Sequence, residues 1–184
     1  MLNGEKIRIR PLTLDDVQPM LELVQRNRSF LQPFEPIRPE SYFTAAGQHS
    51  AIEQAIRQWK SDQGYPFGIF LLENHSLIGR VNLSNVVRGA WQNCTIGYFM
   101  DERMQGKGYM TEAVKLAVQY AFATAGLHRV QAAIMPRNLP SKRVVEKAGF
   151  RYEGLSKRYL CINGKWEDHE IYSITSEEWP MPSI

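Results

Sequence analysis

The sequence has only two cysteines among its 184 residues, Cys94 and Cys161. Neither belongs to a Cys-x-x-Cys pair, and no group of histidines and cysteines has the spacing of metal ligands, so the sequence predicts no metal site. So little cysteine is typical of a reducing compartment, and we expect a cytoplasmic protein. No apolar run approaches the ~20 residues that a membrane helix needs, and residues 1–10 lack a signal core, so we expect no membrane association.

An excess of charge of one sign is also missing. The 22 basic residues against 19 acidic ones give a net charge of +3, which does not predict a specific DNA-binding protein but suits an anionic cofactor. Internal repeats, low-complexity tracts and linkers are absent as well. Because the length is sufficient for one hydrophobic core, we expect residues 1–184 to form a single domain.

Apolar periodicity indicates the order of the elements. It predicts strands at 6–10, 67–73, 77–85, 92–100, 129–135, 150–162 and 165–175, and helices at 13–24, 52–59, 109–125 and 140–147. We expect a kink at Pro19, a loop at 30–43 and a tight hairpin turn at Asn163-Gly164. The order is neither regularly alternating nor all-β, so it predicts an α+β (mixed α/β) fold. We expect a mostly antiparallel, twisted sheet of about seven strands with helices on both faces.

A glycine pair lies between the strand at 92–100 and the helix at 109–125, in residues 103–109 (RMQGKGY). Glycine lets the backbone turn tightly and approach a ligand closely. The helix that follows directs free N–H groups and a partial positive charge into the loop, which favours a phosphate or pyrophosphate. Asp101, Gly108 and Thr111 stand where a Walker loop or a dinucleotide fingerprint needs other residues. By itself, the pair is equally consistent with a plain turn.

A second motif follows the strand at 129–135, in residues 138–150 (NLPSKRVVEKAGF). Together the two motifs resemble those of the GCN5-related N-acetyltransferase (GNAT) superfamily. Its cofactor signature, Gln/Arg-x-x-Gly-x-Gly/Ala, is matched by Arg103, Gly106 and Gly108. Its second signature is matched by Asn138, Ser141, Glu146, Lys147, Gly149 and Phe150. The predicted order of elements is also that of the family, so the resemblance covers nearly the whole chain.

Four further segments, 27–36, 85–90, 109–113 and 163–169, are similar to the RimJ/RimL branch of that superfamily. Members of that branch acetylate the N-terminal residue of ribosomal proteins, and the resemblance is closest to the RimJ type, which modifies an N-terminal alanine of a small-subunit protein. It implies acetyl-CoA as cosubstrate, direct transfer to a protein N-terminus and contact with the ribosome. Two alternatives stay open: a small-molecule amine as acceptor, and a non-catalytic CoA-binding or ribosome-associated module.

The resemblance also implies which residues hold the cofactor. Amides from Gln105 to Met110 would bind the pyrophosphate, the strand end at 98–100 would pair with the pantetheine arm, and Asn138 would hydrogen-bond to that arm. The complete set is Tyr98, Phe99, Met100, Arg103, Gln105, Gly106, Lys107, Gly108, Tyr109, Met110, Asn138 and Ser141.

The thiolate leaving group needs a hydrogen-bond donor. Many family members place a tyrosine seven residues after the asparagine, but here that position is Val145. By resemblance to RimL-like proteins, Ser141 is the predicted acid. Its alternative role is the N-cap of the helix at 140–147, and both roles stay open.

A base must take a proton from the amine. An N-terminal amine has a pKa of ~7.7–8.0, so roughly a fifth to a third is already neutral at pH 7.4, and a weak base is enough. Asp168 and His169 are the catalytic candidates, with Glu102 and His75 behind them. Asp168 and His169 are consecutive on a strand, so only one can face the cleft; either could instead be structural.

Aromatic residues predict an acceptor groove, although packing beneath the 30–43 segment is the alternative. That segment contains only Glu35 and Glu40 as acids, which argues against a polycationic acceptor. Cys94 is expected to be a small buried residue rather than a nucleophile. The predicted groove residues are Phe30, Phe34, Trp91 and Trp166.

Overall fold

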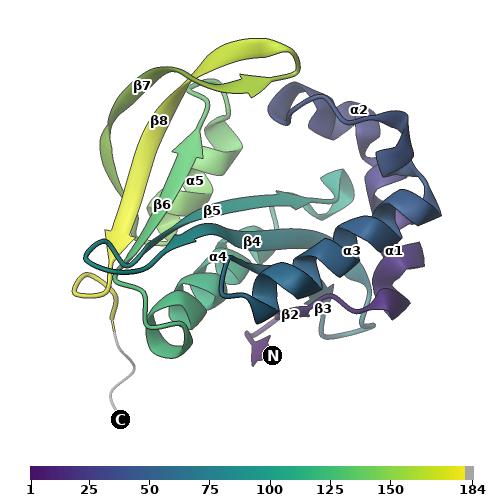
Figure 1. The fold of residues 1–184 in the computed structure, drawn as a ribbon, viewed down its shortest axis with the longest axis horizontal. Helices are drawn as coiled ribbons and strands as arrows, with labels where there is room; N and C mark the ends of the chain where they lie inside the picture. The colour runs from purple at the N-terminus through teal and green to yellow at the C-terminus, as the bar shows by residue number, and fades with distance from the viewer. Residues whose placement is uncertain (181–184) are drawn as a thin grey trace.

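A single eight-stranded sheet organises the chain in the computed structural model, which describes residues 1–180 (Figure 1). The strand order is β1-β2-β3-β4-β5-β6-β8-β7, and only the β5–β6 pair is parallel. The mostly antiparallel α+β fold is therefore confirmed. The strand that the sequence did not predict is the edge strand β1, which has two residues and is too short to show an alternation of apolar and polar side chains. The strands are β1 (Leu2–Asn3), β2 (Ile7–Pro11), β3 (Tyr65–Leu71), β4 (Leu77–Val87), β5 (Asn93–Met100), β6 (Arg129–Ile134), β7 (Arg151–Ile162) and β8 (Lys165–Thr175).

Helices cover both faces of the sheet. Phe70 and Leu77 pack with α1 and α3, whereas their neighbours Ile69 and Ile78 belong to the cluster that contains the buried residues of α4 and α5. Because successive side chains of a strand point to opposite faces, the two helix pairs lie on opposite sides. The helices are α1 (Val17–Arg26), α2 (Arg28–Leu31), α3 (Ala45–Lys60), α4 (Tyr109–Gln119) and α5 (Leu139–Lys147).

Two expectations about helices need correction. Pro19 lies in the first turn of α1, where its missing N–H would have had no acceptor within the helix, so no ladder bond is lost. The helix predicted at 109–125 is α-helical only to Gln119 and continues as a π turn at Tyr120–Thr124. Gly126, with φ of 64°, follows it.

The predicted loop at 30–43 is partly helical. α2 runs into a 3-10 turn at Gln32–Phe34, and a second 3-10 turn covers Glu40–Phe43. Pro33 stands at the start of the first turn and Pro39 caps the second. Proline suits these positions because its fixed φ matches the first helical turn and its missing N–H is not needed there. The prolines thus start short helices where we expected irregular chain.

The two parallel strands separate after a short paired stretch. The β5–β6 ladder runs from Asn93–Arg129 to Ile96–Ala132. Beyond it, β5 stays paired with β4 as far as Met100, and β6 stays paired with β8. Figure 1 shows β5 and β6 diverging, with α2 and the tip of the β7–β8 hairpin on either side of the opening. The facing backbone edges of the two strands therefore lack a ladder partner among residues 1–180.

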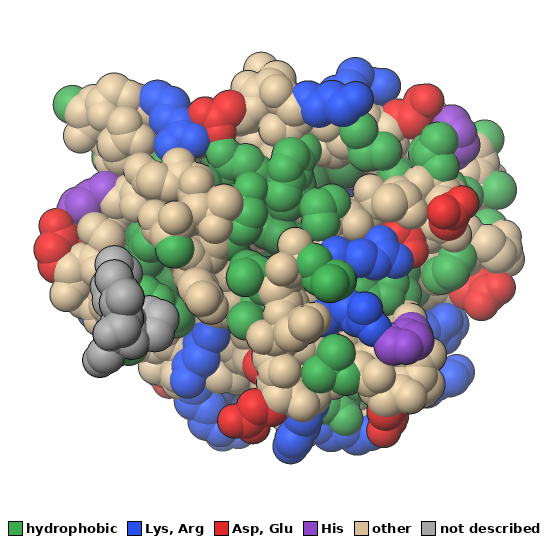
Figure 2. Space-filling model, turned by 90° about the horizontal axis from the view of Figure 1, so that it is seen from below, with side chains coloured by type: hydrophobic (Ala, Val, Ile, Leu, Met, Phe, Trp, Pro, Cys, Tyr) green, Lys and Arg blue, Asp and Glu red, His purple; other side chains and the backbone are tan. Residues whose placement is uncertain are grey.

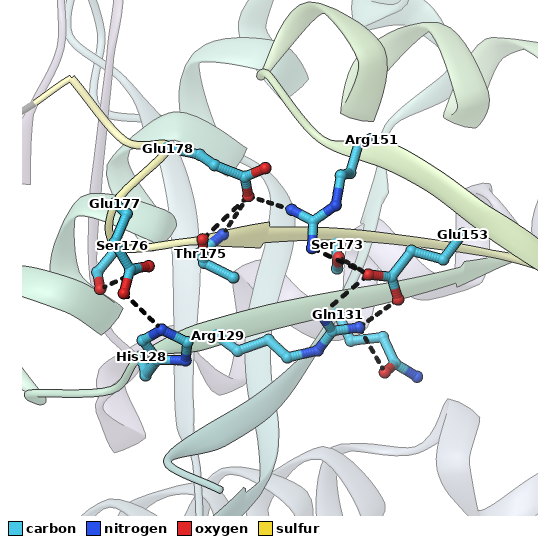
Figure 3. Close-up of polar contacts among 10 residues, drawn as sticks. All are labelled: His128, Arg129, Gln131, Arg151, Glu153, Ser173, Thr175, Ser176, Glu177 and Glu178. Atoms are coloured by element: carbon cyan, nitrogen blue, oxygen red, sulfur yellow. Dashed lines mark hydrogen bonds and ion pairs between the residues drawn. The ribbon is translucent and has the colours of Figure 1, made fainter.

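An ion-pair network ties β6, β7 and β8 together at the end where β5 and β6 are still paired (Figure 3). Arg129 pairs with Glu153, which also accepts a hydrogen bond from Ser173 Oγ at 2.6 Å. Arg151 links Glu153 to Glu178. Arg129, Ser173 and Arg151 together lower the pKa of Glu153 to about 2. The network therefore joins β6 to the β7–β8 hairpin at this end of the sheet.

Candidate active site

A cavity of about 300 Å³ lies where β5 and β6 diverge. Gly97 of β5 lines it and is exposed, although it belongs to a central strand. A Cβ added at Gly97 would meet no atom within 4 Å, so the missing side chain keeps space open rather than avoiding a clash. The lining residues are Phe34, Pro36, Ile96, Gly97, Tyr98, Ala132, Ala133, Ile134, Met135, Asn138, Ser141, Leu160, Cys161, Ile162 and His169.

The glycine loop leads from the end of β5 into α4. Gly106 and Gly108 have φ of 75° and 84°, a conformation that other residues adopt only with strain. Gly108 is the N-cap of α4, and no side chain caps that helix. Its first N–H groups therefore stay available for an anion. The cations Arg103 and Lys107 are exposed beside them.

The start of this loop is anchored by residues that the sequence did not single out. Asp101 is 3% exposed and forms an ion pair with Arg26 of α1 at 2.7 Å. The neighbouring Asn27 accepts the N–H of Glu102 at 2.9 Å. These partners are 75 residues apart in the sequence, and no local pattern connects them. They fix the loop relative to α1.

Ser141 is not the N-cap of α5, contrary to one of our two predictions. Asn138 caps the helix, and its Oδ1 accepts the Ser141 N–H at 3.3 Å. α5 begins earlier than predicted because Leu139 and Pro140 belong to its first turn. The Ser141 hydroxyl is therefore not used as a cap, and both Ser141 and Asn138 line the cavity.

Tyr98 places a second hydroxyl beside Ser141. The Tyr98 Oη lies 2.9 Å from Ser141 Oγ and 3.1 Å from the Ser141 carbonyl oxygen. Burial raises the pKa of Tyr98 far above its usual value, so the phenol stays protonated. Val145, where the family usually has a tyrosine, is fully buried. The sequence predicts a role only for the backbone of Tyr98. Its hydroxyl contact was not predictable, because it joins residues that are 43 apart in the sequence.

His169 and Asp168 have separate surroundings. His169 lines the cavity and is 3% exposed. Its Nδ1 lies 3.0 Å from the Glu167 carbonyl oxygen, which can only accept, so Nδ1 carries a hydrogen and Nε2 is the ring nitrogen that can offer a lone pair. Asp168 instead accepts the N–H of Arg158 at 2.8 Å. Arg158 has φ of 50° within a β7–β8 irregularity, so Asp168 supports the hairpin.

The other base candidates lie away from the cavity. Glu102 is exposed beside the glycine loop, and His75 is exposed and contacts Arg8 at a separate, smaller pocket. Cys94 is fully buried, and burial raises the pKa of its thiol to about 12. It is therefore not a nucleophile.

Of the four predicted groove residues, the structure brings only Phe34 to the cavity. Phe30 is partly buried outside it. Trp91 is 55% exposed just before β5, and Trp166 is 62% exposed on β8. The opposite wall, Leu160, Cys161 and Ile162, was missed because an alternating strand does not reveal which residues its curvature brings to a ligand.

The 33–37 segment and the β7–β8 hairpin are joined above the cavity. The Asn163 N–H donates to the Glu35 carbonyl at 3.0 Å. Arg137 donates to the Pro33 carbonyl at 3.1 Å and forms an ion pair with Glu167 at 3.0 Å. These contacts close a bridge from α2 to the hairpin.

On the face away from the opening, basic and acidic side chains are interspersed around apolar ones (Figure 2). Among residues 1–180, no group of three or more histidines, cysteines, aspartates or glutamates is arranged to hold a metal ion. Over the same residues, no helix is long and apolar enough to span a bilayer.

Known proteins share this sequence and fold. The family model described as acetyltransferase (GNAT) domain matches residues 6–151. A probable N-acetyltransferase of Bacillus subtilis (strain 168), YjcK, is 46% identical over 97% of this chain and 98% of its own. The [ribosomal protein uS5]-alanine N-acetyltransferase of Escherichia coli (strain K12) is 34% identical over 97% and 92%. The structure of Mycobacterium smegmatis RimJ in complex with CoA-disulfide is 30% identical, with a TM-score of 0.90 over 95% of this chain and 84% of that one.

Proposed function

The chain belongs to the GNAT acetyltransferase family, and from that premise we propose that it transfers an acetyl group from acetyl-CoA to the N-terminal amine of a protein. We propose the N-terminal alanine of a small-subunit ribosomal protein as the acceptor, in the cytoplasm, because a relative with 34% identity over nearly the whole chain is a uS5-alanine acetyltransferase. The observation that carries the chemistry is the cavity between β5 and β6. It is lined both by a hydroxyl pair and by a histidine with a lone pair.

The residues present fit acetyl-CoA. The uncapped start of α4 and the two left-handed glycines suit a pyrophosphate,. The unpaired edge of β5 from Gly97 to Met100 offers backbone groups to the amides of a pantetheine arm, as an added strand would,. Asn138 stands beside the same passage. Bound there, acetyl-CoA supplies the thioester carbonyl and the thiolate leaving group.

Proton movements are assigned to two opposite walls of the cavity. His169 Nε2 accepts the proton that the amine loses as its nitrogen forms the new bond to the acetyl carbon. Ser141 Oγ–H donates to the departing sulfur, and Tyr98 Oη–H supports the serine oxygen as it does so. A backbone N–H on the free edge of β5 stabilises charge on the carbonyl oxygen.

Charge favours a protein N-terminus over a polycationic small molecule. The acids of the 30–43 segment already have arginine partners, because Glu35 pairs with Arg38 at 3.2 Å and Glu40 pairs with Arg28. Neither carboxylate is free to attract a polyamine or an aminoglycoside. An N-terminal amine needs no such attraction, since a large fraction is neutral near pH 7.4.

The test measures release of CoA thiol from acetyl-CoA. The acceptors are peptides that begin with alanine or serine, the same peptides with a blocked N-terminus, and a panel of small amines, with mass spectrometry to locate the acetyl group. We expect turnover on free N-termini, none on blocked peptides, and a strong loss in Ser141→Ala. Turnover confined to small amines would reject a protein acceptor, and CoA binding without any turnover would indicate a binding module.

A further inference from the structure

One cation on β4 has no carboxylate partner among residues 1–180. Arg80 is partly buried, and its Nε donates to Asn82 Oδ1 at 2.7 Å. Among residues 1–180, no hydrogen bond uses its two terminal nitrogens and no carboxylate oxygen lies within 4 Å of them. Nearby Arg38 and Arg28, in contrast, each pair with a glutamate. Burial lowers the pKa of Arg80, so its charge is poorly hydrated as well as unpaired.

The strand register places Arg80 on the same face of the sheet as Gly97, which lines the cavity. Arg80 lies opposite Phe99 and Asn82 lies opposite Gly97 in the β4–β5 ladder, and residues directly opposite each other share a face. Gly97 is the open position that lines the cavity. Phe99 packs against the buried cluster that contains residues of α1 and α3. Arg80 therefore lies about 7 Å along the strand from Gly97, on the face that α1 and α3 share.

The groups around Arg80 do not neutralise it. Asn82 contributes an uncharged oxygen and orients the guanidinium through Nε. The ionisable groups that influence it are Tyr42, Arg38 and Glu35, and the last two are already bonded to each other. One unit of positive charge therefore remains beside the cavity. The guanidinium is held in one orientation, and its two terminal nitrogens form no hydrogen bond to residues 1–180. It therefore has the geometry that binds a carboxylate through two parallel hydrogen bonds.

We propose that Arg80, oriented by Asn82, binds a carboxylate on the acceptor and makes the enzyme select substrates with an acidic residue close to the N-terminus. This inference rests on the proposed function, because it assumes a peptide acceptor. An extended peptide advances about 3.3 Å per residue, so an acid at the second to fourth position would reach a guanidinium this far from Gly97. Arg80 is thus a positioning residue for the acceptor and takes no part in the chemistry.

The experiment compares peptides that all begin with alanine and carry either glutamate or the isosteric glutamine at position two, three or four. We expect kcat/KM to favour glutamate at least about tenfold at one position, through a lower KM for the peptide. In Arg80→Gln the preference falls below twofold, while glutamine peptides react as before. Arg80→Lys retains part of the preference because it keeps the charge. Arg57→Gln, at an exposed arginine of α3 whose contact with Glu53 is 4.0 Å long, leaves it intact.

Calorimetric binding of CoA to each variant reports whether the fold and donor site are preserved, and we expect no change. Equal turnover of glutamate and glutamine peptides by the wild type would overturn the role of Arg80 and leave the proposed function standing. Equal slowing of both peptides in Arg80→Gln would show a merely structural residue and also overturn it. Turnover of small amines with none of any peptide would reject the proposed function, and this inference with it.

Discussion

Removing the Ser141 hydroxyl tests the proposed donor to the leaving group with little risk to the fold. Asn138 caps α5 through the Ser141 backbone N–H, which Ser141→Ala retains. The Tyr98 phenol loses Ser141 Oγ but keeps the carbonyl oxygen at 3.1 Å, so no buried hydroxyl is left without a partner. The stability of the variant should therefore stay close to that of the wild type.

The expected loss of rate follows from one hydrogen bond to a charged sulfur. Such a bond contributes roughly 1.5–3 kcal/mol, and each 1.36 kcal/mol is a factor of ten in rate, so kcat should fall about 10- to 150-fold. The KM for acetyl-CoA should hardly change, because the glycine loop and the β5 edge bind the rest of the molecule. Steady-state release of CoA with an alanine peptide measures both quantities.

Tyr98→Phe separates support of the serine from direct action. A bond between two neutral hydroxyls contributes about 0.5–1.5 kcal/mol, so we expect a two- to tenfold loss of kcat. Since Tyr98 acts through Ser141, the double variant should be no slower than Ser141→Ala alone. Tyr152→Phe, at a 55% exposed tyrosine of β7, is the matched control and should change nothing. Wild-type kcat in Ser141→Ala, or losses that multiply in the double variant, would refute the reasoning.

Three other changes probe separate parts of the molecule. Gly108→Ala should weaken CoA binding about 5- to 30-fold by calorimetry, because a residue with a Cβ at φ of 84° costs roughly 1–2 kcal/mol,; an unchanged Kd would contradict the site. Glu153 has its pKa lowered from 4.5 to about 2 by Arg129, so its stabilisation is complete above pH 4.5 and is lost as the pH falls through 2. Glu153→Gln should therefore lower the free energy of unfolding by about 1–2 kcal/mol at pH 7 and by much less at pH 2, where the carboxyl is about half protonated, as denaturant titrations would show; an equal loss at both values would count against the ion pairs. A thiol reagent should label the exposed Cys161 and not the buried Cys94, and bound CoA should slow that labelling, since Cys161 lines the cavity; labelling unaffected by CoA would place the arm elsewhere.

Elements governed by local chemistry were predictable from the sequence. The Asn163-Gly164 turn has the two positive φ values, 45° and 81°, that its dipeptide predicts. At the start of the helix predicted at 13–24, Asp16 Oδ2 accepts the Thr13 backbone N–H at 2.8 Å, and Gly108 adopts a left-handed conformation at the start of α4. In each of these, the determining contacts lie within a few residues.

Features governed by distant contacts were not predictable. The Tyr98–Ser141 pair and the anchoring of Asp101 by Arg26 join residues that only the sheet brings together. The cavity wall formed by Leu160, Cys161 and Ile162 depends on how far the β7–β8 hairpin bends. Asn138 rather than Ser141 caps α5, which begins one residue earlier than predicted, and the serine hydroxyl is not used as a cap.

The bridge between the 33–37 segment and the β7–β8 hairpin has a steric consequence for the proposed acceptor. A peptide that enters the cavity by its free N-terminus passes beneath this bridge as one extended backbone. A chain that must double back beneath the bridge places two backbones side by side and needs more space. Lysines within a folded protein lie on backbone that continues in both directions, and they would have to be presented on a hairpin. Threading under the bridge would thus exclude most internal amines before any contact with the reacting groups, and selection of a terminus would follow from topology as well as from pKa.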